Sequence, residues 1–181
     1  ALTPVWLSVM MVAGAFVTVL SYLPLRTPAQ RLGAAAVAGA VIVGGFAAML
    51  HGSALLTRDL DVCALLTPEN VDKLRHVLRE FHPIHRMTPQ RLPFLGNPEP
   101  GVSLHNLYLQ TDLGPLDILS SITGVGDYGR VLETSIEIDL FGERVRVISI
   151  DELLKSKEAL GREKDRLAAK ELRAIIQKGR P

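Results

Sequence analysis

The first part of the chain alternates apolar runs of strand type with apolar residues at helical spacing. The apolar run at residues 40–43 and the stretch 59–65, where two aspartates alternate with apolar residues, predict two strands, and residues 45–50 between them predict a short helix. After Thr67-Pro68-Glu69, a capped helix start, apolar side chains recur every three or four positions. The pattern therefore predicts a strand, a helix, a second strand and a helix that covers the sheet.

The second half of the chain carries two hairpin patterns and a charged helical end. The first hairpin joins residues 104–110 and 115–119, and the second joins residues 135–140 and 144–149. Before them, five of the eleven prolines fall between residues 83 and 100, which predicts an irregular connection. Ser149-Ile150-Asp151-Glu152 has the form of a capping box, so a helical C-terminal region is expected to begin there.

An apolar segment without charged residues, at 5–23, precedes Thr27-Pro28-Ala29-Gln30, a capping box that predicts a helix running until Gly39. The apolar segment is long enough to cross a bilayer as a helix of about 20 residues, so a membrane anchor, a signal-like segment and a non-native extension are all open. No positive charge precedes it, which disfavours secretion, and Arg26 and Arg31 after it favour a cytoplasmic domain, tethered on that side if the segment spans. We expect an N-terminal segment at 1–26 and one domain at 27–181.

Composition narrows the function classes without choosing one. The 20 Lys and Arg residues balance 19 Asp and Glu residues to a formal net charge of +1, so the chain as a whole has no strong attraction for nucleic acid, although a local patch is compatible with this balance. Cys63 is the only cysteine, which excludes an intramolecular disulfide and a cysteine-based zinc site within this sequence.

Two features between Val41 and Val62 indicate metal and phosphate chemistry. Asp59 and Asp61 lie on a predicted strand, and alternate side chains of a strand share a face, so both carboxylates are expected on one side. Carboxylates at this spacing suit hard cations. Gly44-Gly45, between a strand and a helix, allows a phosphate to approach the backbone N–H groups. A metal and a triphosphate would then lie side by side.

These residues resemble the signature of the DNA polymerase β-like nucleotidyltransferase superfamily: an apolar residue, Gly, Gly or Ser, about a dozen residues, then Asp-x-Asp or Asp-x-Glu. Val43-Gly44-Gly45 and Asp59-Leu60-Asp61 fit it. With residues 46–53 and Thr57-Arg58, the segment looks like the small bacterial stand-alone members, the minimal nucleotidyltransferases and the abortive-infection toxin type. The resemblance covers residues 27 to the end. It implies an α+β, two-layer fold with a mixed sheet flanked by helices and a helical C-terminal region.

The resemblance implies binding of a nucleoside triphosphate, such as ATP, and transfer of its nucleoside monophosphate to an acceptor hydroxyl. Pyrophosphate would be released, and two metal ions would take part in the mechanism. Mg²⁺ or Mn²⁺ would be held by Asp59, Asp61 and a third carboxylate from a later strand. Asp117 is the candidate, because an unpaired charge between Leu116 and Ile118 is costly unless it faces a cleft or a cation. Its alternative is a solvent contact at a strand end. The nucleotide-binding groups expected near these carboxylates are Gly44, Gly45, Ser53 and Arg58.

The stretch from Lys157 to Asp165 resembles the Lys, Ala, Arg and Lys-Asp pattern that closes the toxin-type members. It implies that Lys157 acts catalytically on the phosphates and that Arg162 and Lys164 bind nucleotide. The alternative is a solvated helix face with salt-bridge spacing.

The acceptor is open between a protein hydroxyl, a tRNA end and a small molecule. A different class of function is a non-catalytic nucleotide-binding module of the same fold, or a partner in a toxin–antitoxin pair. The presence of all three carboxylates argues against the non-catalytic module.

Overall fold

The computed structural model describes residues 39–99, 101–102, 104–112, 114–140 and 143–179. The predicted apolar segment, the helix predicted to follow it and the domain boundary at residue 27 lie outside the described residues. Within the described ranges, no helix is both long enough and apolar enough to cross a bilayer.

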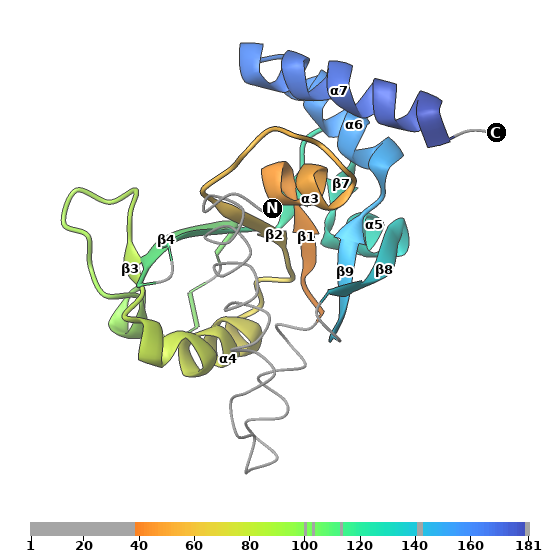
Figure 1. The fold of residues 1–181 in the computed structure, drawn as a ribbon. Coiled ribbons are helices and arrows are strands. Elements are labelled where there is room, and N and C mark those ends of the chain that lie inside the picture. Colours follow the sequence, from red (N-terminus) through yellow and green to blue (C-terminus); the bar gives the residue numbers. More distant parts are fainter. Residues whose placement is uncertain (1–38, 100, 103, 113, 141–142, 180–181) are drawn as a thin grey trace.

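A seven-stranded mixed sheet forms the centre of the molecule (Figure 1), with the strand order β3-β4-β5-β2-β1-β9-β8. β2 pairs antiparallel with β1 and parallel with β5, and β1 pairs parallel with β9. The strands are β1 (Val41–Val43), β2 (Leu60–Cys63), β3 (Ile84–His85), β4 (Asn106–Thr111), β5 (Gly114–Leu119), β8 (Ser135–Leu140) and β9 (Glu143–Ile148). β6 (Ser121–Ile122) and β7 (Gly126–Asp127) pair separately. Both predicted hairpins are confirmed, as β4–β5 and β8–β9.

The helices are α3 (Gly44–Leu50), α4 (Pro68–Leu78), α5 (Tyr128–Glu133), α6 (Ile150–Leu160) and α7 (Glu163–Gly179), with short 3₁₀ helices at Arg79–Phe81 and Phe94–Gly96. The helices α3, α4 and α6 lie where the sequence predicts them, α7 completes the predicted helical C-terminal region, and α5 was not predicted. Thr67 caps α4 as predicted, because its Oγ1 accepts a hydrogen bond from the Asn70 N–H at 3.3 Å. The proline-rich segment is mostly irregular, apart from β3 and one 3₁₀ turn.

The capping box predicted at the start of α6 is wrong in its chemistry, although the helix begins where expected. Ser149 makes no side-chain hydrogen bond to the helix. Glu152, only 7% exposed, is instead held by Lys155 at 2.8 Å and Arg130 at 3.7 Å. A buried carboxylate gains more from charged partners than from a backbone N–H, so the ion pairs replace the box.

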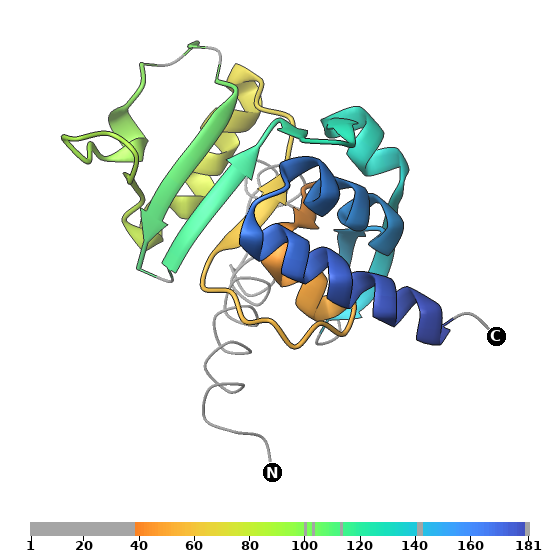
Figure 2. The ribbon, with the colours of Figure 1, turned by 90° about the horizontal axis from the view of Figure 1, so that it is seen from above.

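Two hydrophobic clusters lie on opposite faces of the sheet. α4 packs against one face, through a cluster made of Val62, Ala64, Leu66, Val71, Leu74, Val77, Leu78, Phe94, Leu107, Leu109, Leu116 and Ile118. α3, α5, α6 and α7 share the other cluster with β1 and β9. Figure 2 shows α7 in front and α4 behind β4 and β5. β4 and β5 therefore bury one face under α4 and leave the other face free to line a site.

Candidate active site

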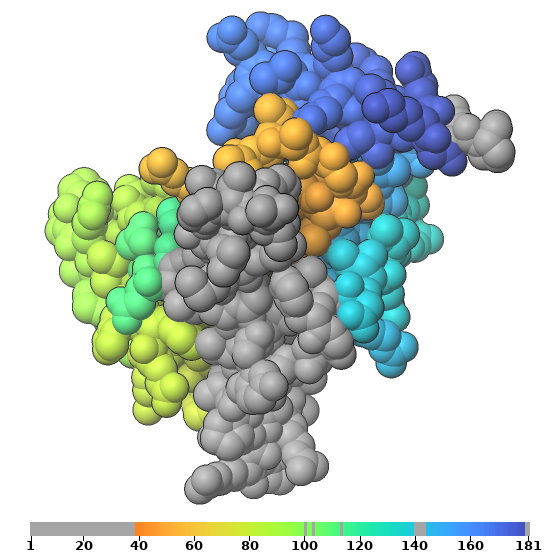
Figure 3. All heavy atoms as spheres, in the orientation of Figure 1, coloured from red at the N-terminus to blue at the C-terminus, as the bar shows by residue number. Residues whose placement is uncertain are grey.

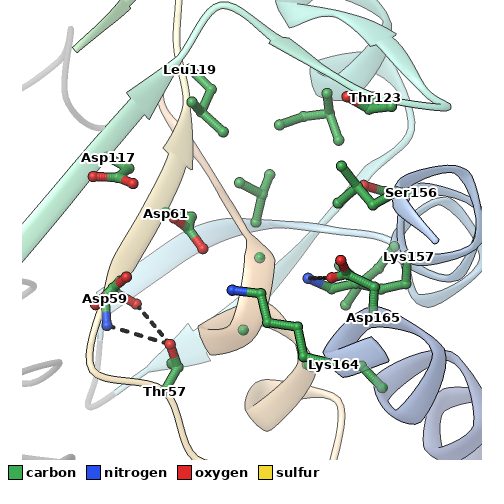
Figure 4. Close-up of a pocket in the computed structure, with 18 of the residues that line it drawn as sticks. Thr57, Asp59, Asp61, Asp117, Leu119, Thr123, Ser156, Lys157, Lys164 and Asp165 are labelled. Carbon is green, nitrogen blue, oxygen red and sulfur yellow. Dashed lines mark hydrogen bonds and ion pairs between the residues drawn. The ribbon is translucent and has the colours of Figure 1, made fainter. Parts of the chain in front are cut away.

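A pocket of about 720 Å³ opens between the sheet and the C-terminal helices. Figure 4 shows three aspartates on the sheet side of this pocket and Lys157, Lys164 and Asp165 on the helical side. Most of the predicted site residues line it, and they are Gly44, Gly45, Asp59, Asp61, Asp117, Lys157, Arg162 and Lys164. The fold thus brings the Gly-Gly and Asp-x-Asp motifs together with the C-terminal cations.

Strand register explains why two of the aspartates meet. β2 and β5 are parallel neighbours in which Asp61 stands opposite Asp117, at the usual strand spacing of about 4.8 Å. On β5, Leu116 and Ile118 pack in the α4 cluster, so the alternation of side chains turns Asp117 to the opposite face, toward the pocket. Asp59, two positions before Asp61, precedes β2 and lines the same pocket.

The environment of Asp61 disfavours its negative charge. Its pKa is raised from 3.8 to about 6, mainly by burial and then by the neighbouring charges of Asp117 and Asp59. Lys157 and a hydrogen bond from the Gly45 N–H act in the opposite direction. The aspartate cluster is therefore short of positive charge.

Asp117 already has a cationic partner, Arg86. Nη2 of Arg86 donates to both carboxylate oxygens of Asp117, at 2.6 Å to Oδ1 and 2.5 Å to Oδ2, and Nε donates to Oδ1 at 3.2 Å. The guanidinium lies 5.7 Å from the ring centroid of Tyr108, and the Arg86 N–H donates to the Tyr108 carbonyl at 2.9 Å. The hydrogen bonds to Asp117, together with the negative charges of Asp117, Asp59 and Asp61, raise the pKa of Arg86 further above its ordinary value.

The three carboxylates fit a divalent cation in donor type and in placement on one wall. Carboxylate oxygens are the ligands that Mg²⁺ and Mn²⁺ prefer, and a cation would relieve the unfavourable charge on Asp61. Across the described residues, however, no three acidic, histidine or cysteine side chains are gathered in a ready ligand group, and both oxygens of Asp117 are bonded to Arg86. The magnesium site stays a prediction.

The Gly-Gly pair makes room for the aspartate and its loop. A Cβ on Gly44, whose φ is +64°, would lie 1.9 Å from Oδ2 of Asp61, and a Cβ on Gly45 would lie 2.8 Å from the Cβ of Thr57. The N–H of Gly45 donates to Asp61. In this structure the glycines thus let a carboxylate approach the backbone, and the predicted phosphate contact at Gly44 and Gly45 stays a prediction.

Asp165 organises the cations on the helical side. It is 1% exposed and contacts the Arg162 Nε at 2.5 Å and the Lys157 Nζ at 3.5 Å. Gly161 ends α6 with a φ of +63°, so the chain turns and α7 places Asp165 beside Lys157. The burial of Asp165 and of Lys157, whose side chain is 12% exposed, contradicts the alternative of a solvated helix face for these two residues.

Ser53 and Arg58, two of the predicted nucleotide-binding residues, are not among the residues that line this pocket. Ser53 is 3% exposed and its Oγ donates to Oε2 of Glu171 on α7 at 2.5 Å, while Arg58 is exposed. A buried hydroxyl donates its hydrogen bond to the nearest charged acceptor. For Ser53 that acceptor is Glu171, on a helix more than a hundred residues later in the chain.

Glu171 forms hydrogen bonds with the loop that leads to Asp59. Besides Ser53, its carboxylate accepts from the Ala54 N–H at 2.9 Å, and Ser53 Oγ in turn accepts from the Leu55 N–H at 3.2 Å. Figure 3 shows this segment, in orange, against the blue α7. These hydrogen bonds lower the pKa of Glu171. Glu171 therefore connects α7 to the chain that supplies Thr57 and Asp59 to the pocket.

We expect Glu171→Ala to loosen this loop. Amide exchange at residues 54–57 should accelerate at least tenfold, and stability should fall by about 1 kcal/mol, because two acceptor bonds are lost at a partly exposed site. Hydrogen exchange followed by mass spectrometry checks this, with the exposed Glu80→Ala as the control. Unchanged protection of the loop would show that α7 does not hold it.

Sequence patterns missed Arg86 and Glu171, and for Tyr108 they favoured half-buried packing over stacking on a base. Arg86 follows a two-residue strand in a proline-rich segment, and nothing periodic in that segment marks it. Tyr108 had a local signal, since β4 alternates polar Asn106, Tyr108 and Gln110 with apolar residues. Glu171 had none, because its partner lies 118 positions away.

Comparison of the structure with solved structures identifies the fold. No family model matches the chain, and no curated protein matches it significantly by sequence. A candidate nucleotidyltransferase from Thermotoga maritima aligns with a TM-score of 0.51 and 15% identity over 98% of this chain and 96% of that one. An antigenic nucleotidyltransferase-like protein from Paracoccidioides brasiliensis aligns with a TM-score of 0.53 and 15% identity over 96% of this chain and 78% of that one.

The chain therefore shares the fold of these two structures, both described as of nucleotidyltransferase type, in agreement with the fold that its Gly-Gly and Asp-x-Asp motifs imply. The mixed sheet flanked by helices and the helical C-terminal region are confirmed. At this level of identity the similarity establishes the fold and leaves the reaction to be argued from the site.

Proposed function

We propose that this protein transfers a nucleoside monophosphate from a nucleoside triphosphate to an acceptor hydroxyl and releases pyrophosphate. One observation carries the proposal: Asp61 and Asp117 stand in register on neighbouring strands, with Asp59 beside them, and face Lys157 across one pocket. The fold of the neighbouring solved structures, both described as of nucleotidyltransferase type, supports the same reaction class.

The balance of the reaction defines what the pocket must do. The acceptor oxygen forms a bond to the α-phosphorus, and the bond from that phosphorus to the oxygen bridging to the β-phosphate breaks. The proton leaves the acceptor hydroxyl, and a carboxylate at the position of Asp117 is suited to receive it. Negative charge then grows on the departing pyrophosphate, where cationic groups lower the barrier.

The residues of the helical side are suited to that charge. Lys157 is held by Asp165 with its Nζ in the pocket, and Lys164 extends into the same space (Figure 4). Their ammonium groups would contact phosphate oxygens as point charges, and Arg162 would add a forked contact. Because Asp165 is almost completely buried, it fixes the position of Lys157 rather than binding substrate.

Asp59, Asp61 and Asp117 would hold Mg²⁺ or Mn²⁺. When bound there, the ion supplies a lowered pKa at the attacking hydroxyl and neutralises phosphate charge. The acceptor, whether a protein hydroxyl, a tRNA end or a small molecule, is a question for experiment.

The position of the phosphate label on the nucleoside triphosphate distinguishes nucleotide transfer from phosphate transfer. We expect purified protein with Mg²⁺ and cell lysate to incorporate label from at least one of the four nucleoside triphosphates labelled at the α-phosphate, and none from the same nucleotide labelled at the γ-phosphate. Asp61→Asn serves as the inactive control. Incorporation from the γ-label would indicate a phosphotransferase, and binding of nucleotide without any incorporation would favour a non-catalytic module of this fold.

A further inference from the structure

Four cationic side chains line the pocket of the proposed active site. Lys157 and Arg162 contact Asp165, and Lys164 lies on the same helical side. Arg86 is the one that comes from the sheet side, and its partner is Asp117, a member of the proposed metal-binding set. The contact joins the guanidinium to the carboxylate that would complete the site.

We propose that Arg86 competes with the divalent cation for Asp117, so that Asp117 joins the metal site only when the guanidinium moves away. The inference rests on the proposed function for its metal and goes beyond it by giving Arg86 a positioning role. Arg86 then sets the concentration of metal that the site requires.

The geometry of the pair sets Arg86 and a metal ion in competition for the same carboxylate. Both oxygens of Asp117 accept from Nη2 of Arg86, and Oδ1 also accepts from Nε. A metal ion needs one of these oxygens at about 2.0 to 2.6 Å. It would then lie within a few ångströms of the guanidinium charge in a partly buried site, where like charges repel strongly. One cation therefore displaces the other.

The structure also gives Arg86 freedom to leave. Arg86 lies just after β3, a two-residue strand at the edge of the sheet. The residues that follow, 87–92, are exposed. The side chain of Arg86 is 26% exposed and that of Asp117 is 11% exposed, so the arginine is the partner nearer to solvent. Its flexible stem can swing while the carboxylate stays on the central strands.

Arg86 has a second consequence in the absence of metal. It neutralises one of three clustered carboxylates, which otherwise repel one another. Metal loading at Asp117 is therefore an exchange of one positive group for another, rather than the filling of an empty anionic site. Arg86 acts on the ion only through Asp117, which makes it a positioning residue.

The test is a Mn²⁺ titration of the full chain without nucleotide, followed by the electron paramagnetic resonance signal of free Mn²⁺. Arg86→Met keeps a stem of similar length on Tyr108 and removes the charge. We expect at least tenfold tighter Mn²⁺ binding in this variant. Arg91→Met, an exposed arginine on the same loop, is the matched control and should bind Mn²⁺ as the unmodified chain does.

Two further variants test whether Arg86 acts on Mn²⁺ binding through Asp117. In Asp117→Asn the effect of Arg86→Met should vanish, because the proposed coupling runs through that carboxylate. Arg86→Lys, which retains one charge but not the fork, should bind Mn²⁺ with intermediate affinity and decides the matter if Arg86→Met does not fold. Equal Mn²⁺ affinity of the unmodified chain and these Arg86 variants would overturn the proposal.

The two proposals fail in different ways. If Asp61→Asn weakens Mn²⁺ binding but the Arg86 variants do not change it, the metal site stands and the role of Arg86 falls. If Mn²⁺ binding is insensitive to Asp61→Asn, the metal site itself is wrong, and the proposed transfer mechanism falls with it.

Discussion

Asp61→Asn should lower transfer activity by orders of magnitude while making the protein more stable. The substitution keeps the size of the side chain and removes a charge from the middle of the aspartate cluster. Loss of a ligand from a metal that stabilises transition-state charge removes most of the catalysis. Because burial and two like charges raise the pKa of Asp61 to about 6, its ionised form opposes folding, and the amide does not.

The sign of the pH dependence follows from the raised pKa. The folded chain holds a proton on Asp61 more tightly than the unfolded chain, so stability from this group is lost as the pH rises from about 4 through 6. Without metal, Asp61→Asn should therefore match the unmodified chain near pH 4 and exceed it by about 2 to 3 kcal/mol above pH 7. Urea unfolding at both pH values measures this difference.

Metal should reverse the order of stability. Mg²⁺ with a nucleoside triphosphate stabilises the state that binds it, so the unmodified chain should gain thermal stability and Asp61→Asn should gain much less. A variant that keeps full activity together with the metal-dependent thermal shift would remove Asp61 from the site. It would also remove most of the argument for a nucleotidyltransferase.

Gly44→Ala should damage folding and the site together. A Cβ there would overlap the Asp61 carboxylate, at 1.9 Å from Oδ2, and the neighbouring atoms of that side chain are at 2.6 and 2.8 Å. The residue is also held at a φ of +64°, which alone costs a non-glycine residue about 1 kcal/mol. Because Asp61 must move to relieve the overlap, we expect the protein to lose roughly 3 kcal/mol of stability or more and to lose Mn²⁺ binding.

Gly161→Ala separates the cost of the positive φ from the cost of the overlap with Asp61. Gly161 has nearly the same φ, +63°, but the nearest atom to an added Cβ is the Glu158 carbonyl oxygen at 3.8 Å, an ordinary contact. It should therefore show the backbone cost alone, about 1 kcal/mol, with Mn²⁺ binding retained. Thermal unfolding and Mn²⁺ titration of both variants check the comparison. Equal losses in the two would show that crowding against Asp61 has no role.

The local sequence pattern was sufficient to predict most of the strands and helices that carry the site, and to locate the Gly-Gly and Asp-x-Asp motifs. The strand β2, the hairpin β4–β5 and the helix α4 follow from periodicity and capping, which depend on residues a few positions apart. The position of Asp117 between two buried residues likewise predicts which way it faces. Asp59 was predicted inside the strand but precedes β2, a difference within the usual uncertainty of element ends.

The partners of these residues depended on the tertiary fold. Ser53 was expected to contact phosphate, but α7 brings Glu171 to its hydroxyl. Asp117 was expected to face a cleft or a cation, with a metal ion as the proposed cation, but the chain after the edge strand β3 brings Arg86 onto it. Each contact joins residues from segments that have no common periodicity, separated by 118 positions in the first case and 31 in the second.

The sequence by itself determined where the strands and helices run, the glycines that admit Asp61 and the face on which Asp61 and Asp117 lie, because alternation and spacing act within a single element. Only the tertiary structure decided which charged side chains form ion pairs with each other. A buried carboxylate binds whichever cation the packing of distant segments presents to it, so Asp165 holds Lys157 and Asp117 holds Arg86. The charge state of the pocket is therefore a property of the folded chain and not of its motifs.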